Sequence, residues 1–235
     1  MQDLGRWLMN IKIFAVSLIA FIFVSCAGQN NTAFIPEPDF SVYNVPENFI
    51  EKNNIIETRD GAGINNIPIW LLAYLDGGIG AVEKLDVYKD KYIFIAVKEG
   101  DNINVLNKWN DNFSEKLDFP IIAASRIDKR IISSATLYPD NEYGRFYETM
   151  IKYAYSTEYT GAAKEDSYWI KIWYERENTW EYTESYKYFI LITINKTSLQ
   201  PLIRSMMMRA VSVVTVTNTQ TNAIDRLRQN FFEGF

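Results

Sequence analysis

The stretch YWIKIWYERENTWEYTESYKYFILITI, residues 168–194, carries the clearest structural pattern in the 235-residue chain. Aromatic and β-branched residues, which favour strands, recur at every second position in two arms. The even-numbered apolar positions are Tyr168, Ile170, Ile172 and Tyr174, then Trp180, Tyr182, Tyr186, Tyr188, Ile190, Ile192 and Ile194. This period of two predicts a β-hairpin with one buried face.

The connection between the two arms follows from the same pattern. Residues directly opposite each other in a strand pair lie on one face of the sheet. If both buried sets are even-numbered, even residues pair with even residues, and the loop holds an odd number of residues. We therefore expect three or five loop residues around Arg176 to Asn178.

The odd-numbered residues form the other face of the predicted hairpin. They are Trp169, Lys171, Trp173, Lys187, Phe189 and Leu191. Large apolar side chains beside lysines are typical of an exposed or ligand-facing surface, and aromatic rings can stack on sugars or other planar ligands. The alternative is that a helix or the N-terminal segment covers this face. The sequence thus predicts a candidate binding surface here.

One strand and three helices are predicted upstream of the hairpin. The apolar run Tyr92–Val97 is rich in β-formers and is expected to be a buried strand. A helix from about Asn102 is followed by Pro120, which interrupts or restarts it. The expected buried positions are Leu106, Trp109, Phe113 and Leu117, then Ala124, Ile127, Ile131 and Ala135, and, after a turn at residues 138–144, Phe146, Met150 and Tyr153.

A long helix is predicted after the hairpin, with Thr197 or Ser198 as its N-cap. Apolar positions step by four and three alternately in a heptad seam: Leu199, Ile203, Met206, Ala210, Val213, Thr217, Gln220, Ile224, Leu227 and Phe231. The seam is expected to pack on the sheet or on a partner, which includes an oligomer formed through this helix. The composition of Val211–Thr217 leaves a strand open as the alternative there.

These elements predict an α+β fold, in which a small antiparallel sheet is covered by helices on one face. The folded domain is expected to span residues 67–235. Residues 26–66 are rich in Asn, Pro and Gly and are predicted to be a tether. The glycines of Gly61-Ala-Gly63 and Gly77-Gly78-Ile-Gly80 lack the lysine and hydroxyl residue of a phosphate loop, so turns are expected.

The N-terminus has the pattern of a bacterial signal peptide. An apolar block, Ile13–Ser25, follows Lys12 and ends in a small residue. It is shorter than the roughly 20 apolar residues of a membrane-spanning helix. We therefore predict a signal peptide over residues 1–25, whose translation start is either Met1 or Met9.

The sequence Phe23-Val24-Ser25-Cys26 resembles the lipobox of bacterial lipoproteins, and Cys26 is the single cysteine of the chain. The resemblance implies that Cys26 becomes the first residue and carries acyl chains, including palmitate, which anchor the protein stably in a membrane. The alternative is that Cys26 is one more apolar residue of a secretory signal or an uncleaved helix. The implied location is the outer membrane or the periplasmic face of the inner membrane.

The charge balance argues against nucleic-acid binding. The chain has 29 acidic and 24 basic residues, and removal of residues 1–25 takes away Asp3, Arg6 and Lys12. The remaining 28 acids and 22 bases give a net charge of −6. A protein that binds nucleic acid by neutralising its phosphates needs a positive charge.

The chemistry of the residues limits catalysis. The chain has no histidine, which excludes histidine-dependent triads and ordinary zinc hydrolase sites. Carboxylate chemistry on a glycan needs only Asp and Glu. The candidates are Glu142, Glu148, Glu165 and Asp166, each of which is more simply a solvated residue. We predict a protein that is not an enzyme and has neither cofactor nor metal.

Arg126 lies among small and apolar residues in IIAASRIDKR, residues 121–130. A partly buried arginine can hold a carboxylate through two parallel hydrogen bonds. A structural ion pair is favoured, with Asp128, Asp166 or Glu184 as the partner. A ligand carboxylate is the alternative.

A second resemblance covers about residues 67–208. Its motifs are Pro68-Ile-Trp70, the Ala-rich segment with Arg126, the pair Tyr168-Trp169, and Tyr188–Lys196. The sequence resembles the twenty-kilodalton bacterial surface lipoprotein family and the N-terminal domain of a flagellar-associated periplasmic protein, with Asp128–Thr160 as an insertion. The resemblance implies a non-enzymatic envelope domain.

The function predicted from these observations is a lipid-anchored interaction module with an envelope protein as its partner. The alternatives are a ligand- or glycan-binding lipoprotein that uses the aromatic face of the sheet, or a carboxylate-dependent glycan hydrolase.

Overall fold

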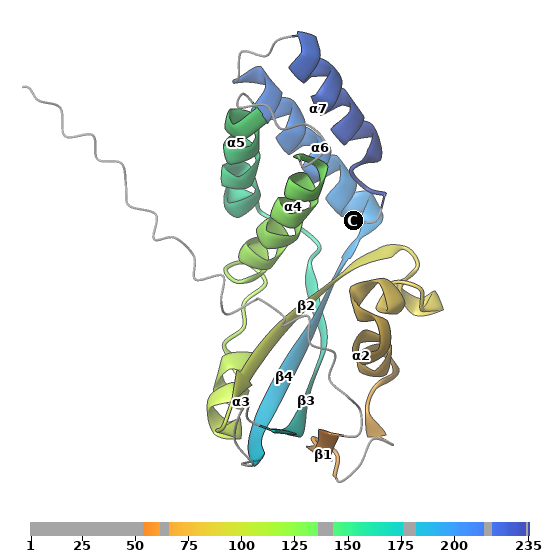
Figure 1. The fold of residues 1–235 in the computed structure, drawn as a ribbon, viewed down its shortest axis with the longest axis vertical. Helices are drawn as coiled ribbons and strands as arrows, with labels where there is room; N and C mark the ends of the chain where they lie inside the picture. The colour runs from red at the N-terminus through yellow and green to blue at the C-terminus, as the bar shows by residue number, and fades with distance from the viewer. Residues whose placement is uncertain (1–53, 62–65, 136–142, 176–181, 214–217, 234) are drawn as a thin grey trace, which may run out of the picture. The chain divides into compact units, whose positions relative to one another are not determined.

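The computed structural model describes residues 54–61, 66–135, 143–175, 182–213, 218–233 and 235 of the chain (Figure 1). All of them belong to the unit Asp39–Phe235. In chain order, the elements are β1 (Ile55–Thr58), α2 (Ile69–Val82), the 3-10 helix η4 (Asp86–Tyr88), β2 (Lys91–Gly100), α3 (Ile103–Asp111), α4 (Phe119–Ala135), α5 (Tyr143–Ser156), β3 (Ala163–Glu175), β4 (Tyr182–Asn195), α6 (Lys196–Ser212) and α7 (Asn218–Asn230). The predicted α+β class is confirmed.

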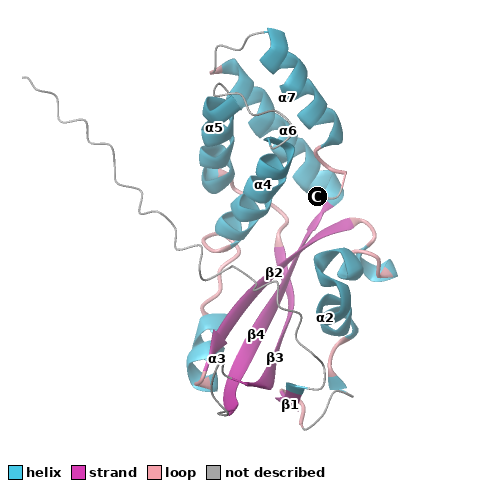
Figure 2. Ribbon diagram, in the orientation of Figure 1, coloured by secondary structure: helices cyan, strands magenta, loops and turns pink. Residues whose placement is uncertain are grey.

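The four strands form one antiparallel sheet in the order β1-β3-β4-β2 (Figure 2). The predicted strand Tyr92–Val97 is confirmed as part of β2, which pairs with β4 from Lys91↔Asn195 to Gly100↔Tyr186. β1 pairs with β3 through Ile55↔Ile172. Because β1 lies within the segment predicted to be a tether, the sheet begins before residue 67.

The hairpin is present, but its predicted register is wrong. Even residues of β3 pair with odd residues of β4, as in Tyr168↔Phe189 and Ile170↔Lys187. The last pair before the loop is Glu175↔Tyr182, so six residues lie between its members instead of three or five. The even-numbered residues of the two arms therefore lie on opposite faces of the sheet.

The register was missed because β4 is buried on both faces. Every residue from Lys187 to Ile194 is buried. In a strand covered on both sides, large apolar residues occur at odd and even positions alike, and alternation no longer marks the buried face. The prediction that helices cover one face is also wrong, because each face has its own core.

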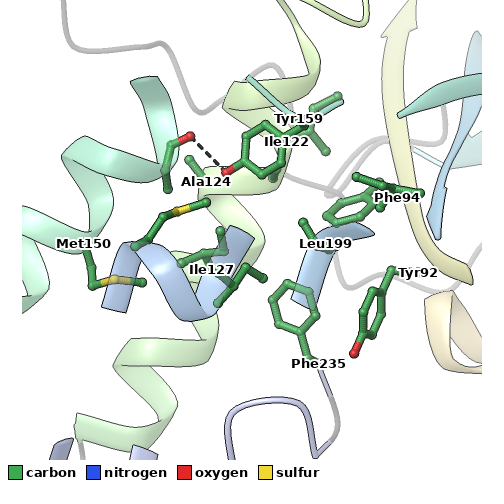
Figure 3. Close-up of a cluster of buried hydrophobic side chains, with 14 of the residues drawn as sticks. Tyr92, Phe94, Ile122, Ala124, Ile127, Met150, Tyr159, Leu199 and Phe235 are labelled. Atoms are coloured by element: carbon green, nitrogen blue, oxygen red, sulfur yellow. Dashed lines mark hydrogen bonds between the residues drawn. The ribbon is translucent and has the colours of Figure 1, made fainter. Parts of the chain in front are cut away.

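The larger core lies on the face that carries Tyr92 and Phe94, and α4, α5, α6 and α7 contribute to it. Figure 2 shows these four helices gathered at the end of the sheet where β4 leads into α6. Figure 3 shows Tyr92, Phe94 and Phe235 close together in this cluster. The rings of Phe94 and Phe119 meet edge to face with centroids 4.9 Å apart.

The smaller core lies on the opposite face, where α2 packs. Trp70, Leu71, Leu75 and Val82 are the buried residues of this helix. They share a cluster with sheet residues Ile93, Ile95, Tyr168, Ile170, Phe189 and Leu191. The sheet is thus the middle layer between α2 and the larger helical group.

The helices predicted upstream of the hairpin are confirmed as α3, α4 and α5. The expected helix start near Asn102 is confirmed, and the side chain of Asn102 caps α3 by accepting a hydrogen bond from the backbone N–H of Asn104. Pro120 lies in the first turn of α4, where backbone N–H groups have no hydrogen-bond partner within the helix, so the N–H that proline lacks breaks no hydrogen bond. Leu117, expected to be buried, is 74% exposed. Most of the predicted turn at 138–144 lies outside the described residues.

The predicted C-terminal helix is two helices. Figure 1 shows α6 and α7 side by side. The start of α6 and the segment after α7 both contact Tyr92 of β2. Gln200 of α6 donates a hydrogen bond to the Tyr92 hydroxyl, and Phe235 contacts the Tyr92 ring. The heptad pattern continues across both helices because both pack on the same core; the buried seam residues are Leu199, Ile203, Met206, Ala210, Ile224, Leu227 and Phe231.

Three seam positions remain. Val213, after α6, is 62% exposed, contrary to the prediction, and Thr217 and the side chain of Gln220 lie outside the described part of the chain. Because the seven buried seam residues pack inside the chain, they leave no exposed apolar stripe for a partner.

Of the glycines expected to form turns, Gly61 does so, whereas Gly77, Gly78 and Gly80 lie within α2 and Gly63 lies outside the described residues. Gly78 has φ 66° and ψ −161°, and together with Gly77 it kinks α2. Gly61 has φ 119° and closes a turn with Thr58. A backbone with positive φ is strained for residues that carry a Cβ atom, so glycine serves both positions.

Candidate functional site

The hairpin presents aromatic and charged side chains on the face shared with the larger core, towards the loop. β3 supplies Trp169, Lys171 and Trp173, and β4 supplies Tyr182, Glu184 and Tyr186. We call these six residues the aromatic face. The register places them together, because Trp173 is opposite Glu184 and Lys171 is opposite Tyr186.

Two ring pairs form the aromatic face. The rings of Trp169 and Tyr186 lie 5.5 Å apart at 75°, and those of Trp173 and Tyr182 lie 5.2 Å apart at 74°. Both are edge-to-face arrangements, which aromatic pairs prefer. Tyr182 is 67% exposed, and the other three rings are half-buried. The rings are therefore held in place by each other while part of their surface meets water.

An ion pair lies between the two ring pairs. Nζ of Lys171 is 2.5 Å from Oε2 of Glu184, and it lies 5.4 Å from the ring centre of Tyr186. The hydrogen bond that Lys171 donates to Glu184 raises the pKa of Lys171, and the negative charge of Glu57 on β1 acts in the same direction. Because Glu184 is mostly exposed, this pair contributes little to stability. It does offer donors and acceptors at the surface.

The aromatic face continues into the protein through Tyr188. This residue is opposite Trp169 and Lys98, and its ring meets Trp109 of α3 edge to face at 6.2 Å. Nζ of Lys98 lies 5.7 Å from the Trp109 ring. Tyr188 is buried, so α3 closes this end of the surface.

Half of the predicted binding surface lies elsewhere. Lys187, Phe189 and Leu191 project to the opposite face and are buried there. Phe189 and Leu191 belong to the smaller core, and Lys187 forms an ion pair with Glu99 at 3.3 Å. Trp169, Lys171 and Trp173 do share one face, but their neighbours are Tyr182, Glu184 and Tyr186. The signal that would have found these three residues is the even-to-odd register of the hairpin.

Arg126 has a structural role. Its guanidinium donates hydrogen bonds to Oε1 of Glu83, at 3.1 Å, and to the carbonyl of Ile93. It also lies 4.5 Å from the ring centre of Phe235. Burial lowers the pKa of Arg126, and Glu83 opposes that shift. The predicted structural ion pair is thus present, but its partner is Glu83 and not Asp128, Asp166 or Glu184.

The candidate carboxylates also have structural partners. Glu165 accepts hydrogen bonds from Lys91 at 2.8 Å and from Thr193 at 2.7 Å, and these bonds lower its pKa. Asp166 accepts a hydrogen bond from the indole of Trp70. Glu148 is exposed on α5, and Glu142 lies outside the described residues. Nothing in these contacts resembles an acid and nucleophile pair.

Two further findings concern the described residues alone. Within them, no three metal-binding side chains come together as a potential metal site. In the same residues, no helix is both long and apolar enough to span a membrane. Cys26 lies outside the described part of the chain.

Comparisons with known proteins give no match: no family model, no curated protein and no solved structure matches the chain. The resemblances to bacterial lipoproteins and to the twenty-kilodalton surface lipoprotein family therefore stay predictions from the sequence.

Proposed function

We propose that the chain is a lipid-anchored binding protein of a bacterial cell envelope and that the aromatic face is its binding surface. The anchor is the acylated Cys26, which holds the protein at the outer membrane or at the periplasmic face of the inner membrane. The protein acts by binding and not by catalysis. The observation that carries the proposal is the pair of edge-to-face contacts, Trp169 with Tyr186 and Trp173 with Tyr182, on a partly exposed sheet face.

Partly exposed aromatic rings gain free energy when a ligand covers them. Tryptophan and tyrosine bury large areas when they are covered, and they are enriched at the centres of binding sites. Here their positions are fixed by ring contacts and by the strands on which they sit. A surface that is already ordered loses little conformational entropy when a ligand binds. Rigid aromatic side chains on a sheet thus favour recognition.

The C-terminal helices are less suited to be a binding surface. The heptad seam was expected to pack on the sheet or on a partner, and Leu199, Ile203 and Phe231 are buried within the same chain. Trp169 and Trp173 instead lie on the half-exposed part of the hairpin. We therefore assign ligand binding to the hairpin and not to α6 or α7.

The anchor is tested by comparing wild type with Cys26→Ser in the native host. Intact mass should show acyl chains on wild type only, and only wild type should enter the detergent phase. If neither protein carries lipid, the envelope-anchoring half of the proposal is wrong.

The binding surface is tested by photo-cross-linking in the same cells. A photoreactive residue at position 182 should give discrete adducts, whereas one at position 213 should not, because Val213 is equally exposed but lies after α6, outside the aromatic face. Equal adduct patterns from both positions would contradict the assignment of the surface.

A further inference from the structure

We propose that the aromatic face binds a glycan strand of the bacterial cell wall. This inference rests on the proposed function, which places the protein in the envelope and makes this face its binding surface. It adds the chemical class of the ligand. The spacing of the rings and the polar groups between them point to a glycan.

The spacing of the rings calls for a chain of sugars. Trp169 and Trp173 are four residues apart on one strand, which corresponds to about 13 Å at roughly 3.3 Å per residue. A single sugar ring is too small to reach both. A strand of linked sugars that follows β3 can place the C–H face of one unit on each ring pair, since aromatic rings are apolar surfaces with a negative face.

The polar groups between the rings suit hydroxyl and acetamido groups. Lys171 brings N–H donors and Glu184 brings carboxylate acceptors to the same point, between Trp169 with Tyr186 and Trp173 with Tyr182. Their charges neutralise each other. A polyanion would instead require unpaired cations, and the chain has a net charge of −5. The surface therefore matches a polyhydroxylated strand without dense charge.

An apolar protein partner fits this surface less well. Within the described parts of β3 and β4, the large apolar side chains that are clearly exposed are two tyrosines, Tyr174 and Tyr182. Among all the residues that the structure describes, the most exposed aliphatic side chains are Ile69, Val87, Leu117 and Val213, and none of them belongs to these strands. Aromatic rings interleaved with an ion pair favour C–H stacking with hydrogen bonding over a purely hydrophobic interface.

The test is co-sedimentation of the mature lipidated protein, in detergent, with purified peptidoglycan sacculi. A soluble tetramer of β-linked N-acetylglucosamine serves as competitor and as titrant for tryptophan fluorescence. The variant is Tyr182→Ala, and the matched control is Tyr174→Ala. Both residues are exposed tyrosines of the hairpin, and the register places them on opposite faces. The thermal unfolding midpoint of each variant verifies that it folds.

Wild type should sediment with the sacculi, and the tetramer should release it. Tyr182→Ala should weaken binding about fivefold, as expected for one lost aromatic contact, and the double variant Trp173→Ala/Tyr182→Ala should weaken it further. Tyr174→Ala should bind like wild type. Equal losses in the two single variants would overturn the assignment to the aromatic face.

Failure of the glycan proposal and failure of the proposed function give different results. If wild type does not bind sacculi or tetramer but position 182 cross-links to a discrete protein, the glycan is wrong and the binding surface stands. If wild type binds neither probe and position 182 gives no specific adduct, both are wrong.

Discussion

Arg126 and Glu83 form an ion pair, 3.1 Å long, that joins the two helical layers around the edge of the sheet. Glu83 follows α2 on one face, and Arg126 belongs to α4 on the other. Between them lies β2, the edge strand. Glu83 accepts a hydrogen bond from the N–H of Ile93, and Arg126 donates one to its carbonyl. The pair therefore satisfies edge groups that would otherwise be open to another strand.

Replacing Arg126 with methionine should lower the free energy of unfolding by about 2 to 4 kcal/mol, because it leaves Glu83 and the Ile93 carbonyl without their partner in a site that is mostly buried. Urea unfolding measures the change. Arg228→Met is the control, since its ion pair with Asp225 is exposed and should be worth less than about 0.5 kcal/mol. Equal losses would contradict the role of the edge pair.

Gly78→Ala should destabilise the protein by about 1 to 3 kcal/mol. The φ of 66° and ψ of −161° at Gly78 are strained for alanine, although a Cβ atom there would meet nothing within 4 Å. Gly80 is the matched control, because it lies in the same helix without a positive φ and also has free space. Gly80→Ala should stabilise the protein by about 0.5 to 1 kcal/mol. Thermal unfolding should show a lower midpoint for Gly78→Ala and a higher one for Gly80→Ala. A shift in the same direction for both variants would contradict the prediction.

Tyr74→Phe should change the dependence of stability on alkaline pH. Burial raises the pKa of Tyr74 from 10.0 to about 12. Between these values the folded chain holds a proton that the unfolded chain has lost, so this contribution is present below pH 10 and is lost as pH rises towards 12. The variant should match wild type at pH 7 and lose stability less steeply above pH 10. Identical slopes in urea unfolding across this range would contradict the burial of the hydroxyl.

Phe231→Ala should cost about 3 to 5 kcal/mol, because its side chain is fully buried in the larger core and contacts Phe232 and Phe235. Val213→Ala, at an exposed position, should change the free energy of unfolding by less than about 0.5 kcal/mol. Guanidinium unfolding compares the two. A small effect of Phe231→Ala would mean that the C-terminal segment does not pack on the core.

Local patterns in the sequence predicted most helices and the strands β2, β3 and β4. The helix start near Asn102 and the restart at Pro120 depend on neighbouring residues, and both predictions are confirmed. The register of β3 on β4 depends on the length of the loop and on coverage of both faces, which alternation within one strand does not encode. The break after α6 was missed because the two helices pack on one core and so keep one pattern.

The candidate site was half predicted for the same reason. Trp169, Lys171 and Trp173 lie on one strand, where a period of two fixes the shared face. Their partners on β4 depend on the register. Without it, the sequence predicted Lys187 as part of the binding surface, whereas the structure places Tyr186 opposite Lys171. The partner of Arg126 could not be read from the sequence either, because Glu83 is distant in the chain and only the packing of α2 brings it near.

The pairing of β2 with β4 has a consequence for how the chain is made. Five successive residues of β2, Tyr92 to Ala96, are buried, and their partners are Ile190 to Ile194. During synthesis, this apolar strand must wait for about 100 further residues before its partner exists, whereas β3 and β4 can pair at once. The β3–β4 hairpin can thus form locally, whereas β2, like β1, joins it only through a pairing between distant parts of the chain. Until β4 has been made, the apolar residues of β2 lack the strand that covers their edge, and a chaperone that holds the growing chain would have a target there.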